Sequence, residues 1–441
     1  MKKSLIALAA VAAVGAASAQ SSVTLYGVLD AAYNNLSATN AGTLSRVTGN
    51  GANQASRIGF RGVEDLGGGL KASFVLEAAI NVDNGTGSTS VANSTTIGQT
   101  LTSGTGNTGA NAINSALASS AGGAQGLTFN RRSTVSLAGN FGEVRVGRDL
   151  TPSFLNLATF DPFGNVGVGS ALNVVLGSLN PAANSVAPPG SPKPQIRSSN
   201  SIGYITPGGL GGFYGQAMYA FSEVPSNCTA FGVAAAGTSL TNTCAGVAGD
   251  GKYLGLRGGY ANGPMDFAVG YGKTNYASNA INPVGLTQTS GTASTAQFRG
   301  NYTVMNFGGS YNFGVAKAMA QYGTQVQQAN LNQGATPTDQ KLTHYLLGVS
   351  VPVGAGEFKA SYNWGKLNKN ATATENDRRQ NQLALGYVHN LSKRTAAYTT
   401  YSRLNASGAN ATATMGLNSS AAIAGSGVSA TGYDIGIRHS F

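Results

Sequence analysis

The last nine residues of the chain, Tyr433 to Phe441, alternate between two kinds of side chain. Apolar and aromatic residues share one face of a predicted strand and polar residues share the other, because strand side chains alternate with a period of two. A final strand that ends on an aromatic residue is typical of the closing strand of a transmembrane β-barrel. A C-terminal edge strand of a soluble sheet would show the same alternation, so the rest of the chain has to decide.

The N-terminus has the features of an export signal. Met1 to Lys3 is basic, Leu5 to Ala17 is apolar, and Ala17-Ser18-Ala19 is a small-residue cleavage site. The apolar run is shorter than the about 20 residues that a spanning helix needs. We therefore predict a cleaved signal peptide over residues 1–19 and one β-barrel domain over residues 20–441.

The composition fits an exported β-protein. Only 10% of residues are charged, against about 25% in an average soluble domain. The mean hydropathy is −0.04, and no long apolar run follows residue 20, so a helical membrane protein is excluded. The 18 Tyr and 16 Phe are spread over the chain, which argues against disorder as the reason for the many Gly, Ser, Thr and Asn residues.

Segments with strand periodicity recur along the whole chain, joined alternately by short turns and much longer loops. We count sixteen such segments and predict an all-β, sixteen-stranded antiparallel transmembrane barrel. A barrel of this size encloses an aqueous lumen, because the diameter grows with strand number. The segments are 23–34, 56–62, 70–82, 131–138, 143–148, 200–206, 213–221, 253–260, 265–271, 296–313, 315–325, 342–353, 357–364, 383–388, 395–401 and 433–441.

Several of these segments carry motifs by which the chain resembles the general trimeric porins of Gram-negative bacteria, most closely their β-proteobacterial branch. The resemblance covers about residues 20 to 441. The motifs are Ser22-Val23-Thr24-Leu25-Tyr26-Gly27, the segment from Ser56 to Ala72, Gly142-Glu143-Val144-Arg145-Val146-Gly147-Arg148, Asp161-Pro162-Phe163-Gly164, and Gly436-Ile437-Arg438-His439-Ser440-Phe441.

The resemblance implies a homotrimer in the cell outer membrane, with a third external loop folded into the lumen as a constriction. It implies passive ion transport and diffusion of small hydrophilic solutes and inorganic anions, without enzymatic chemistry. The expected surroundings are outer-membrane lipid and lipopolysaccharide. We expect no metal or nucleotide cofactor, since Gly67-Gly68-Gly69 is a turn with no following helix to receive a phosphate.

The segment from Thr151 to Ser198 is the candidate for the constricting loop. It is long, rich in proline and poor in charge, and a loop of that length without strand pattern is usually functional. Its first part is too apolar to extend into water, so we predict that it packs against the inner barrel wall. The apolar residues are Phe154, Leu155, Leu157, Phe160 and Phe163.

The candidate pore-lining residues are charged residues whose alternation along a strand points them into the barrel. Arg57 and Arg61 alternate with the outward Ile58 and Phe60, and Arg197 has the phase opposite to Ile202 and Tyr204. By resemblance, Arg57, Arg148 and Arg197 form the basic side of the constriction, with Asp161 as the acidic candidate on the loop. Further lumen candidates are Arg61, Arg132 and Asp30.

The charge balance predicts weak to moderate anion selectivity. The formal net charge is +11, and removal of Lys2 and Lys3 with the signal leaves +9. Facing charges in a narrow passage set the ion preference by their excess sign. Nucleic acid is not an expected partner, because the basic residues are scattered singly through strands instead of clustering on a soluble module.

Other chemistry is sparse. Cys228 and Cys244 lie in one long loop of an exported chain, which predicts a disulfide. A two-Cys metal site is the alternative, although no His is near.

Two other functions remain open. A barrel hydrolase would need a Ser, His and acid to converge, and an outer-membrane adhesin would use the Ser/Thr/Asn-rich loops Asp83 to Gly126 and Asn405 to Val428.

Overall fold

The computed structural model describes residues 22–87, 126–177, 179, 196–222, 251–278, 298–331, 340–369, 377–408, 412–416, 423–425 and 429–441. Eighteen strands form one antiparallel sheet, and β2 (Gly42–Val47) and β5 (Thr86–Gly87) are short extensions of it. The other sixteen strands form a closed barrel, which confirms the predicted fold class. No helix among the described residues is long and apolar enough to cross a membrane.

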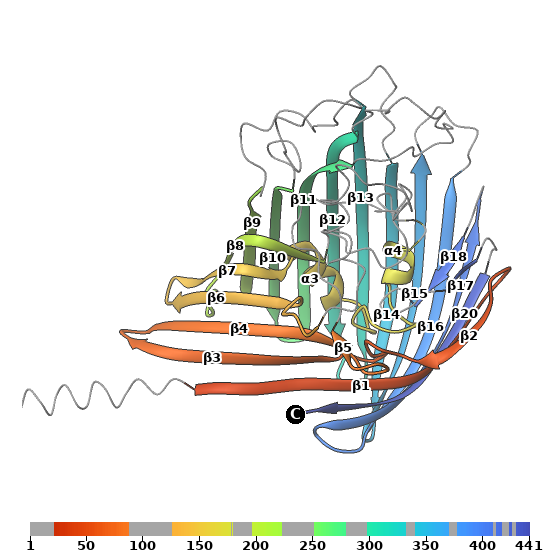
Figure 1. Ribbon diagram of the computed structural model, residues 1–441, viewed down its shortest axis with the longest axis horizontal. Coiled ribbons are helices and arrows are strands. Elements are labelled where there is room, and N and C mark those ends of the chain that lie inside the picture. The colour runs from red at the N-terminus through yellow and green to blue at the C-terminus, as the bar shows by residue number, and fades with distance from the viewer. Residues whose placement is uncertain are drawn as a thin grey trace, which may run out of the picture.

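The wall strands follow one another around the barrel in chain order (Figure 1). They are β1 (Ser22–Ala38), β3 (Arg57–Gly67), β4 (Leu70–Asn81), β6 (Arg132–Gly139), β7 (Gly142–Leu150), β8 (Arg197–Ile205), β9 (Phe213–Ala220), β10 (Tyr253–Asn262), β11 (Met265–Ser278), β12 (Phe298–Asn312), β13 (Lys317–Leu331), β14 (Gln340–Val353), β15 (Gly356–Lys369), β16 (Arg378–Asn390), β17 (Thr395–Ser407) and β20 (Ser429–Ser440).

The first and last strands close the ring. β1 pairs with β3 through Ser22–Val28 and with β20 through Val28–Ala38. The backbone N–H of Gly27 donates to Phe441 at 3.0 Å, and that of Phe441 donates back to Gly27 at 3.1 Å. The Phe441 ring occupies the space that a side chain at position 27 would need. The C-terminal aromatic residue is thus part of the closure.

The two faces of the wall have opposite composition. On β20, Tyr433, Ile435 and Ile437 are 37%, 57% and 52% exposed, whereas Asp434 between them is fully buried. The same alternation of exposed apolar and buried polar residues recurs around the ring. The outward face therefore suits lipid and the inward face suits water and hydrogen bonds, as the periodicity predicts.

All sixteen predicted segments coincide with wall strands, although many strands extend further towards the long loops. The predicted segment 383–388, for example, belongs to β16, which begins at Arg378. Outward positions at that end carry Arg379 and Asn381 in place of apolar residues. Backbone pairing continues where the apolar alternation stops, so periodicity alone ends many of the strands too early.

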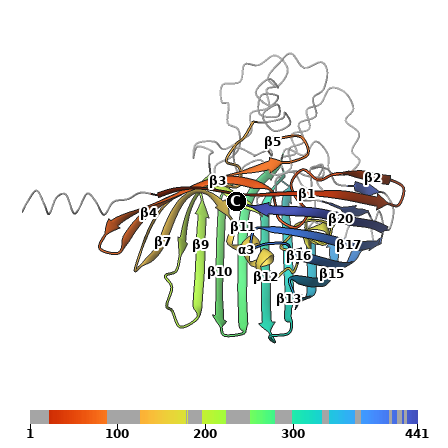
Figure 2. The ribbon, with the colours of Figure 1, turned by 90° about the horizontal axis from the view of Figure 1, so that it is seen from below.

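Between β7 and β8 the chain leaves the wall and forms two helices, α3 (Pro152–Thr159) and α4 (Leu172–Val175). Both views place α3 within the ring of strands (Figures 1 and 2). A small hairpin, β18 (Ala413–Met415) with β19 (Ile423–Gly425), packs near α4, and Met415 and Val174 belong to one buried apolar cluster.

Candidate functional site

The loop that contains α3 and α4, here called the inner loop (residues 151–196), begins with a local helix signal. Thr151 caps α3 by accepting a hydrogen bond from the N–H of Phe154 at 3.3 Å, and Pro152 occupies the first turn. Phe154, Leu157, Phe160 and Phe163 are each at most 9% exposed. Leu155 is half-buried. Four of the five apolar residues of the predicted inward part are therefore buried.

Uncharged hydrogen bonds hold α3 against β11, β12 and β13. The Asn156 amide donates to the Asn306 Oδ1 at 2.7 Å, and Gln321 donates to the Leu157 carbonyl at 2.9 Å. The Phe160 ring lies over Gly308, where a side chain would collide with it. Arg257 on β10 adds a charged contact, since its guanidinium donates to Asn156 Oδ1 at 3.1 Å. The same guanidinium lies over the Tyr214 ring, with its carbon atom 4.8 Å from the ring centroid.

The second half of the inner loop contacts the strands that follow. Gln325 donates to the Val175 carbonyl at 3.2 Å, and Gln382 donates to the Val168 carbonyl at 2.8 Å. The N–H of Val168 donates to Asp434 on the closing strand at 2.9 Å. The loop is therefore attached along the inner wall from β10 to β20.

Asp161, the acidic residue assigned by resemblance to the loop side of the constriction, lies inside the loop itself. It is 4% exposed and accepts backbone N–H bonds from Phe163, Asn165 and Ala171 at 3.0 to 3.1 Å. Burial raises the pKa of its carboxyl, and these hydrogen bonds oppose the shift. Among the described residues no cation comes within salt-bridge distance of it, so its observed contacts organise the turn between the two helices.

The remaining sector of the inner wall carries the predicted arginines. We call it the arginine wall; it comprises six arginines on β3, β6, β7, β8 and the residue before β6, with three carboxylates among them. The formal excess is three positive charges. The arginines are Arg57, Arg131, Arg132, Arg145, Arg148 and Arg197, and the acids are Glu77, Glu143 and Asp149.

Glu77 connects two sides of the arginine wall. Its carboxylate accepts from Arg131 at 2.6 Å and from the Tyr26 hydroxyl at 3.1 Å, and it lies 3.5 Å from Arg57. Arg197 donates to the backbone carbonyl of Arg131 at 2.9 Å. The structure thus brings Arg57 and Arg197 into one network through residues that the sequence analysis did not select.

Arg148 joins this network because the wall is irregular beside it. Strict alternation would give Arg148 the outward phase of Val144 and Val146, but the pairing of β7 with β8 shifts between Gly147 and Asp149. Gly147 has φ +126°, and a side chain there would collide with the Ser133 carbonyl. Arg148 consequently donates to the Asn130 carbonyl and to Ser199 Oγ, each at 2.6 Å.

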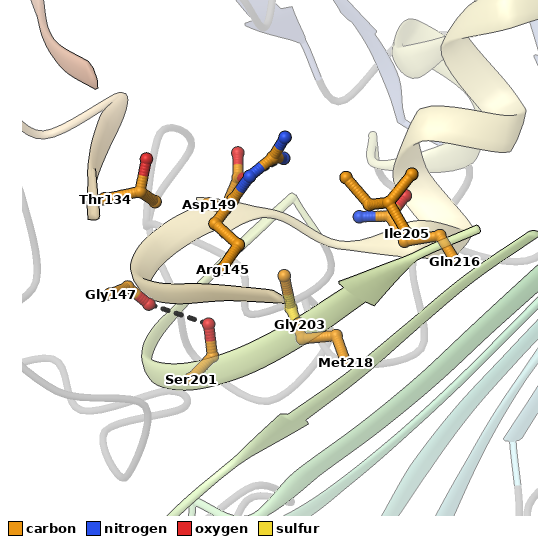
Figure 3. A pocket seen from close by; sticks show the side chains of 9 residues that line it. All are labelled: Thr134, Arg145, Gly147, Asp149, Ser201, Gly203, Ile205, Gln216 and Met218. Carbon is orange, nitrogen blue, oxygen red and sulfur yellow. Dashed lines mark hydrogen bonds and ion pairs between the residues drawn. The ribbon is translucent and has the colours of Figure 1, made fainter. Parts of the chain in front are cut away.

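Figure 3 shows the hollow in the wall beside this bulge, where Arg145 and Asp149 stand next to each other. Arg145 donates to Asp149 at 2.6 Å and also pairs with Glu143 at 3.0 Å. Arg132 lies 3.7 Å from the same Asp149 oxygen atom. Ser201 donates to the carbonyl of Gly147 at 2.7 Å, which ties β8 to the bulge. Arg132 and Arg145 therefore share the carboxylate of Asp149, as Arg57 and Arg131 share that of Glu77.

The other two lumen candidates lie apart from this network. Arg61 is exposed and its guanidinium sits 5.4 Å from the Tyr26 ring centroid. Asp30 is fully buried; it accepts backbone N–H bonds from Asn53 at 3.0 Å and Gln54 at 2.6 Å, and the Tyr398 hydroxyl donates to it. Asp30 thus anchors the segment between β2 and β3 and does not line an open passage.

Three residues that the sequence analysis did not select carry much of this geometry: Glu77, Arg131 and Arg257. Alternation could have identified Glu77 and Arg257. Each directly follows a leucine with the outward phase, Leu76 on β4 and Leu256 on β10, so each has the inward phase. Arg131 precedes β6. Alternation over the predicted segment 131–138 would give it the phase opposite to the inward Arg132, so this signal could not find it.

The remaining candidate chemistry is dispersed. Cys228 and Cys244 lie outside the described residues. Within the part of the chain that the structure describes, the three histidines have different neighbours: His344 is buried on β14, His389 lies 3.1 Å from the Tyr387 hydroxyl, and His439 lies 2.9 Å from Thr395 Oγ1. No group of His, Cys, Asp or Glu in this part could hold a metal ion.

Comparison with known proteins gives consistent matches. The family model described as Gram-negative porin matches residues 5–409. Outer membrane porin protein 32 of Delftia acidovorans is 37% identical over 447 aligned residues, which span all of both chains. The solved anion-selective porin from Comamonas acidovorans has a TM-score of 0.66 and 33% identity, covering 96% of this chain and 100% of that one. The trimer form of OmpT from Vibrio cholerae has a TM-score of 0.58 at 14% identity, covering 96% and 99%, and supports the fold alone.

Proposed function

Because the chain belongs to the Gram-negative porin family, we propose that the arginine wall gives its channel a preference for anions. The channel is a passive one in the outer membrane. The observation that carries the proposal is the excess of three positive charges on one sector of the inner wall. The inner loop does not offset it, since Asp161 is the only acid in the sequence from 151 to 196 and its carboxylate is occupied by backbone N–H groups.

In this mechanism an anion passes between the arginine wall and the inner loop. Fixed positive charges in a passage with low-dielectric walls raise the local anion concentration and repel cations. Arg57 and Arg131 share Glu77, and Arg132 and Arg145 share Asp149. This partial pairing weakens their hold on a passing ion, which then leaves readily. Passage needs neither a covalent step nor a cofactor, so we propose no enzymatic activity.

We further propose that the protein assembles as a homotrimer. The related structures support this only as analogy, since the solved trimer of OmpT shares the fold at low sequence identity. Small hydrophilic solutes and inorganic anions are the proposed permeants. Outer-membrane lipid and lipopolysaccharide are the proposed surroundings of the outward apolar face.

Planar-bilayer recording of the purified protein in a salt gradient tests these proposals together. We expect insertion in steps of three coupled conductance units and a reversal potential with the sign of anion preference. A reversal potential of the opposite sign would refute the role of the arginine wall. Silence from protein that is verified as folded would contradict an open passage.

A further inference from the structure

Arg438 is an inward arginine on the closing strand, outside the group of residues that we call the arginine wall. It belongs to the C-terminal motif from Gly436 to Phe441 and alternates with the outward Ile437 and His439 on β20. Its side chain is half-buried, whereas both of these neighbours are exposed. The strand that closes the barrel therefore also directs an arginine towards the lumen.

The register places Arg438 beside the arginine wall, across the seam where the barrel closes. β20 lies next to β1 at this seam (Figure 1). Arg57 on β3 pairs with Val28 of β1, and Arg438 pairs with Asp30, two residues further along the same strand. Because neighbouring strands lie about 4.8 Å apart, only two strand spacings separate the two arginines.

A short segment of chain, Ala52 to Ala55, contacts both guanidinium groups, and we call it the inner strip. Arg438 Nη1 donates to the Asn53 Oδ1 of the strip at 2.7 Å. Arg57 Nη1 donates to the backbone carbonyl of Ala55 at 2.9 Å. Asp30 holds the strip between the two arginines by accepting backbone N–H bonds from it at 2.6 to 3.4 Å. One segment therefore fixes both arginines on the same side of the lumen.

The positive charge of Arg438 is not used in an ion pair with any acid that the structure describes. Asp30, its partner in register, is fully buried and takes its hydrogen bonds from the inner strip and from Tyr398. Asp434 on the same strand is also fully buried and accepts from Asn34 and from the inner loop. Each of these acids has its own donors, so the Arg438 guanidinium stays available to the lumen.

The hydrogen bonding of Arg438 is incomplete for a residue kept for structure alone. Its Nε atom is buried and finds no acceptor among the described residues. A buried donor without a partner costs stability. The bond to Asn53 needs only one N–H group, which a neutral amide side chain could also supply. The contacts therefore explain a charge at this position better than they explain a structural support.

We infer that Arg438 is a further residue that determines ion selectivity, and that it extends the basic surface of the pore across the seam to the closing strand. An anion beside Arg57 then has a second guanidinium within two strand spacings, held in place by the inner strip. Fixed positive charge over a wider arc of the lumen raises the local anion concentration further. The inference rests on the proposed anion preference and adds a charge that lies beyond the arginine wall.

Reversal potentials of two Arg438 variants in a salt gradient separate a role of the charge from a structural role. Arg438→Gln removes the charge but can still donate to Asn53, and Arg438→Lys keeps the charge without the planar guanidinium. We expect the anion-to-cation permeability ratio to fall by roughly 1.5-fold in Arg438→Gln and to stay near the wild-type value in Arg438→Lys. Arg403→Gln, at an exposed outward position of β17, is the matched control and should leave the ratio unchanged. Equal losses in both Arg438 variants, or no change in Arg438→Gln, would overturn the inference.

Charge restored or inverted at the same position gives a second test. Arg438→Cys is treated with a cationic or an anionic methanethiosulfonate reagent, and the treated wild type controls for Cys228 and Cys244. The cationic reagent should raise the anion-to-cation ratio of the variant towards that of the wild type, and the anionic reagent should lower it. No shift with either reagent would show that position 438 does not face the passage.

The recordings also distinguish this inference from the proposed function. Cation preference in the wild type would contradict the proposed function itself. A wild type that prefers anions, together with Arg438 variants that leave the ratio unchanged, would overturn only the role of Arg438.

Discussion

The inner wall from β3 to β8 and the inner wall from β10 to β16 present different side chains to the lumen. The first carries six arginines and three carboxylates, and its pairing is interrupted at Gly147. The second is regular and holds the inner loop chiefly through neutral amides, among them Asn306, Gln321 and Gln382. Charge is thus concentrated on one side, while the opposite side fixes the position of the loop mainly through neutral groups, with Arg257 as its charged contact.

This difference separates two properties of the pore. Fixed charges determine which ions enter, and loop position determines how wide the passage is. Neutral hydrogen bonds and buried apolar contacts are also insensitive to salt, whereas the influence of partly exposed arginines weakens as ionic strength rises. A change on one wall should therefore alter selectivity and leave conductance nearly unchanged, and a change on the other should do the reverse.

Removing charge from the arginine wall should have the largest effect. The triple variant Arg57→Gln/Arg148→Gln/Arg197→Gln keeps hydrogen-bond donors at each position but cancels the excess positive charge of the wall. We expect the anion-to-cation permeability ratio to fall by about threefold or more, as measured by reversal potentials in a salt gradient. Arg403→Gln, which removes an outward charge, is the control and should not shift the reversal potential. An unchanged permeability ratio in the triple variant would refute the proposed role of the arginine wall in ion selectivity.

Changing the loop-bearing wall should alter conductance. In Gly308→Ala the added methyl group collides with the Phe160 ring, so the end of α3 has to move towards the lumen. We expect a smaller single-channel conductance with the same sign of selectivity, and a loss of about 1 to 3 kcal/mol in unfolding free energy. Gly203→Ala on β8 is the matched control, because the nearest atom to its added methyl group is 3.6 Å away. Normal conductance in Gly308→Ala would show that the loop is not held where these contacts place it.

Within the arginine wall, Glu77 and Glu143 allow a finer comparison. Glu77→Gln leaves Arg57 and Arg131 without their carboxylate, so unfolding free energy should fall by about 2 kcal/mol while anion preference rises. Glu143→Gln removes the same charge, but Arg145 keeps its bond to Asp149. The control should therefore show a similar shift in selectivity with less destabilisation in urea unfolding. Equal destabilisation would contradict the connecting role of Glu77.

The sequence predicts the wall better than the site. All sixteen strands follow from periodicity, because each has one face in lipid and one in water. Periodicity cannot predict the bulge at Gly147, which re-aims Arg148 after a strand whose alternation would turn it outward. Nor can it predict that Asp30 and Asp161 bind backbone N–H groups, since that depends on how chain segments between regular elements fold over each carboxylate. Charge type was readable from sequence, but the partners of each charge were not.

Asp161 provides the smallest expected effect and the sharpest test of the asymmetry. Asp161→Asn keeps one carbonyl oxygen but replaces the other with a donor that faces backbone N–H groups, so the turn between α3 and α4 should loosen. We expect noisier single-channel current and a small loss of stability, with the reversal potential unchanged. If Asp161 instead acted as the acid opposite the arginines, its removal would increase anion preference in the same recording. In one outcome only the current noise changes, and in the other the reversal potential changes. Recordings of the wild type and of Asp161→Asn therefore decide whether the loop side of this pore contributes charge to ion selectivity.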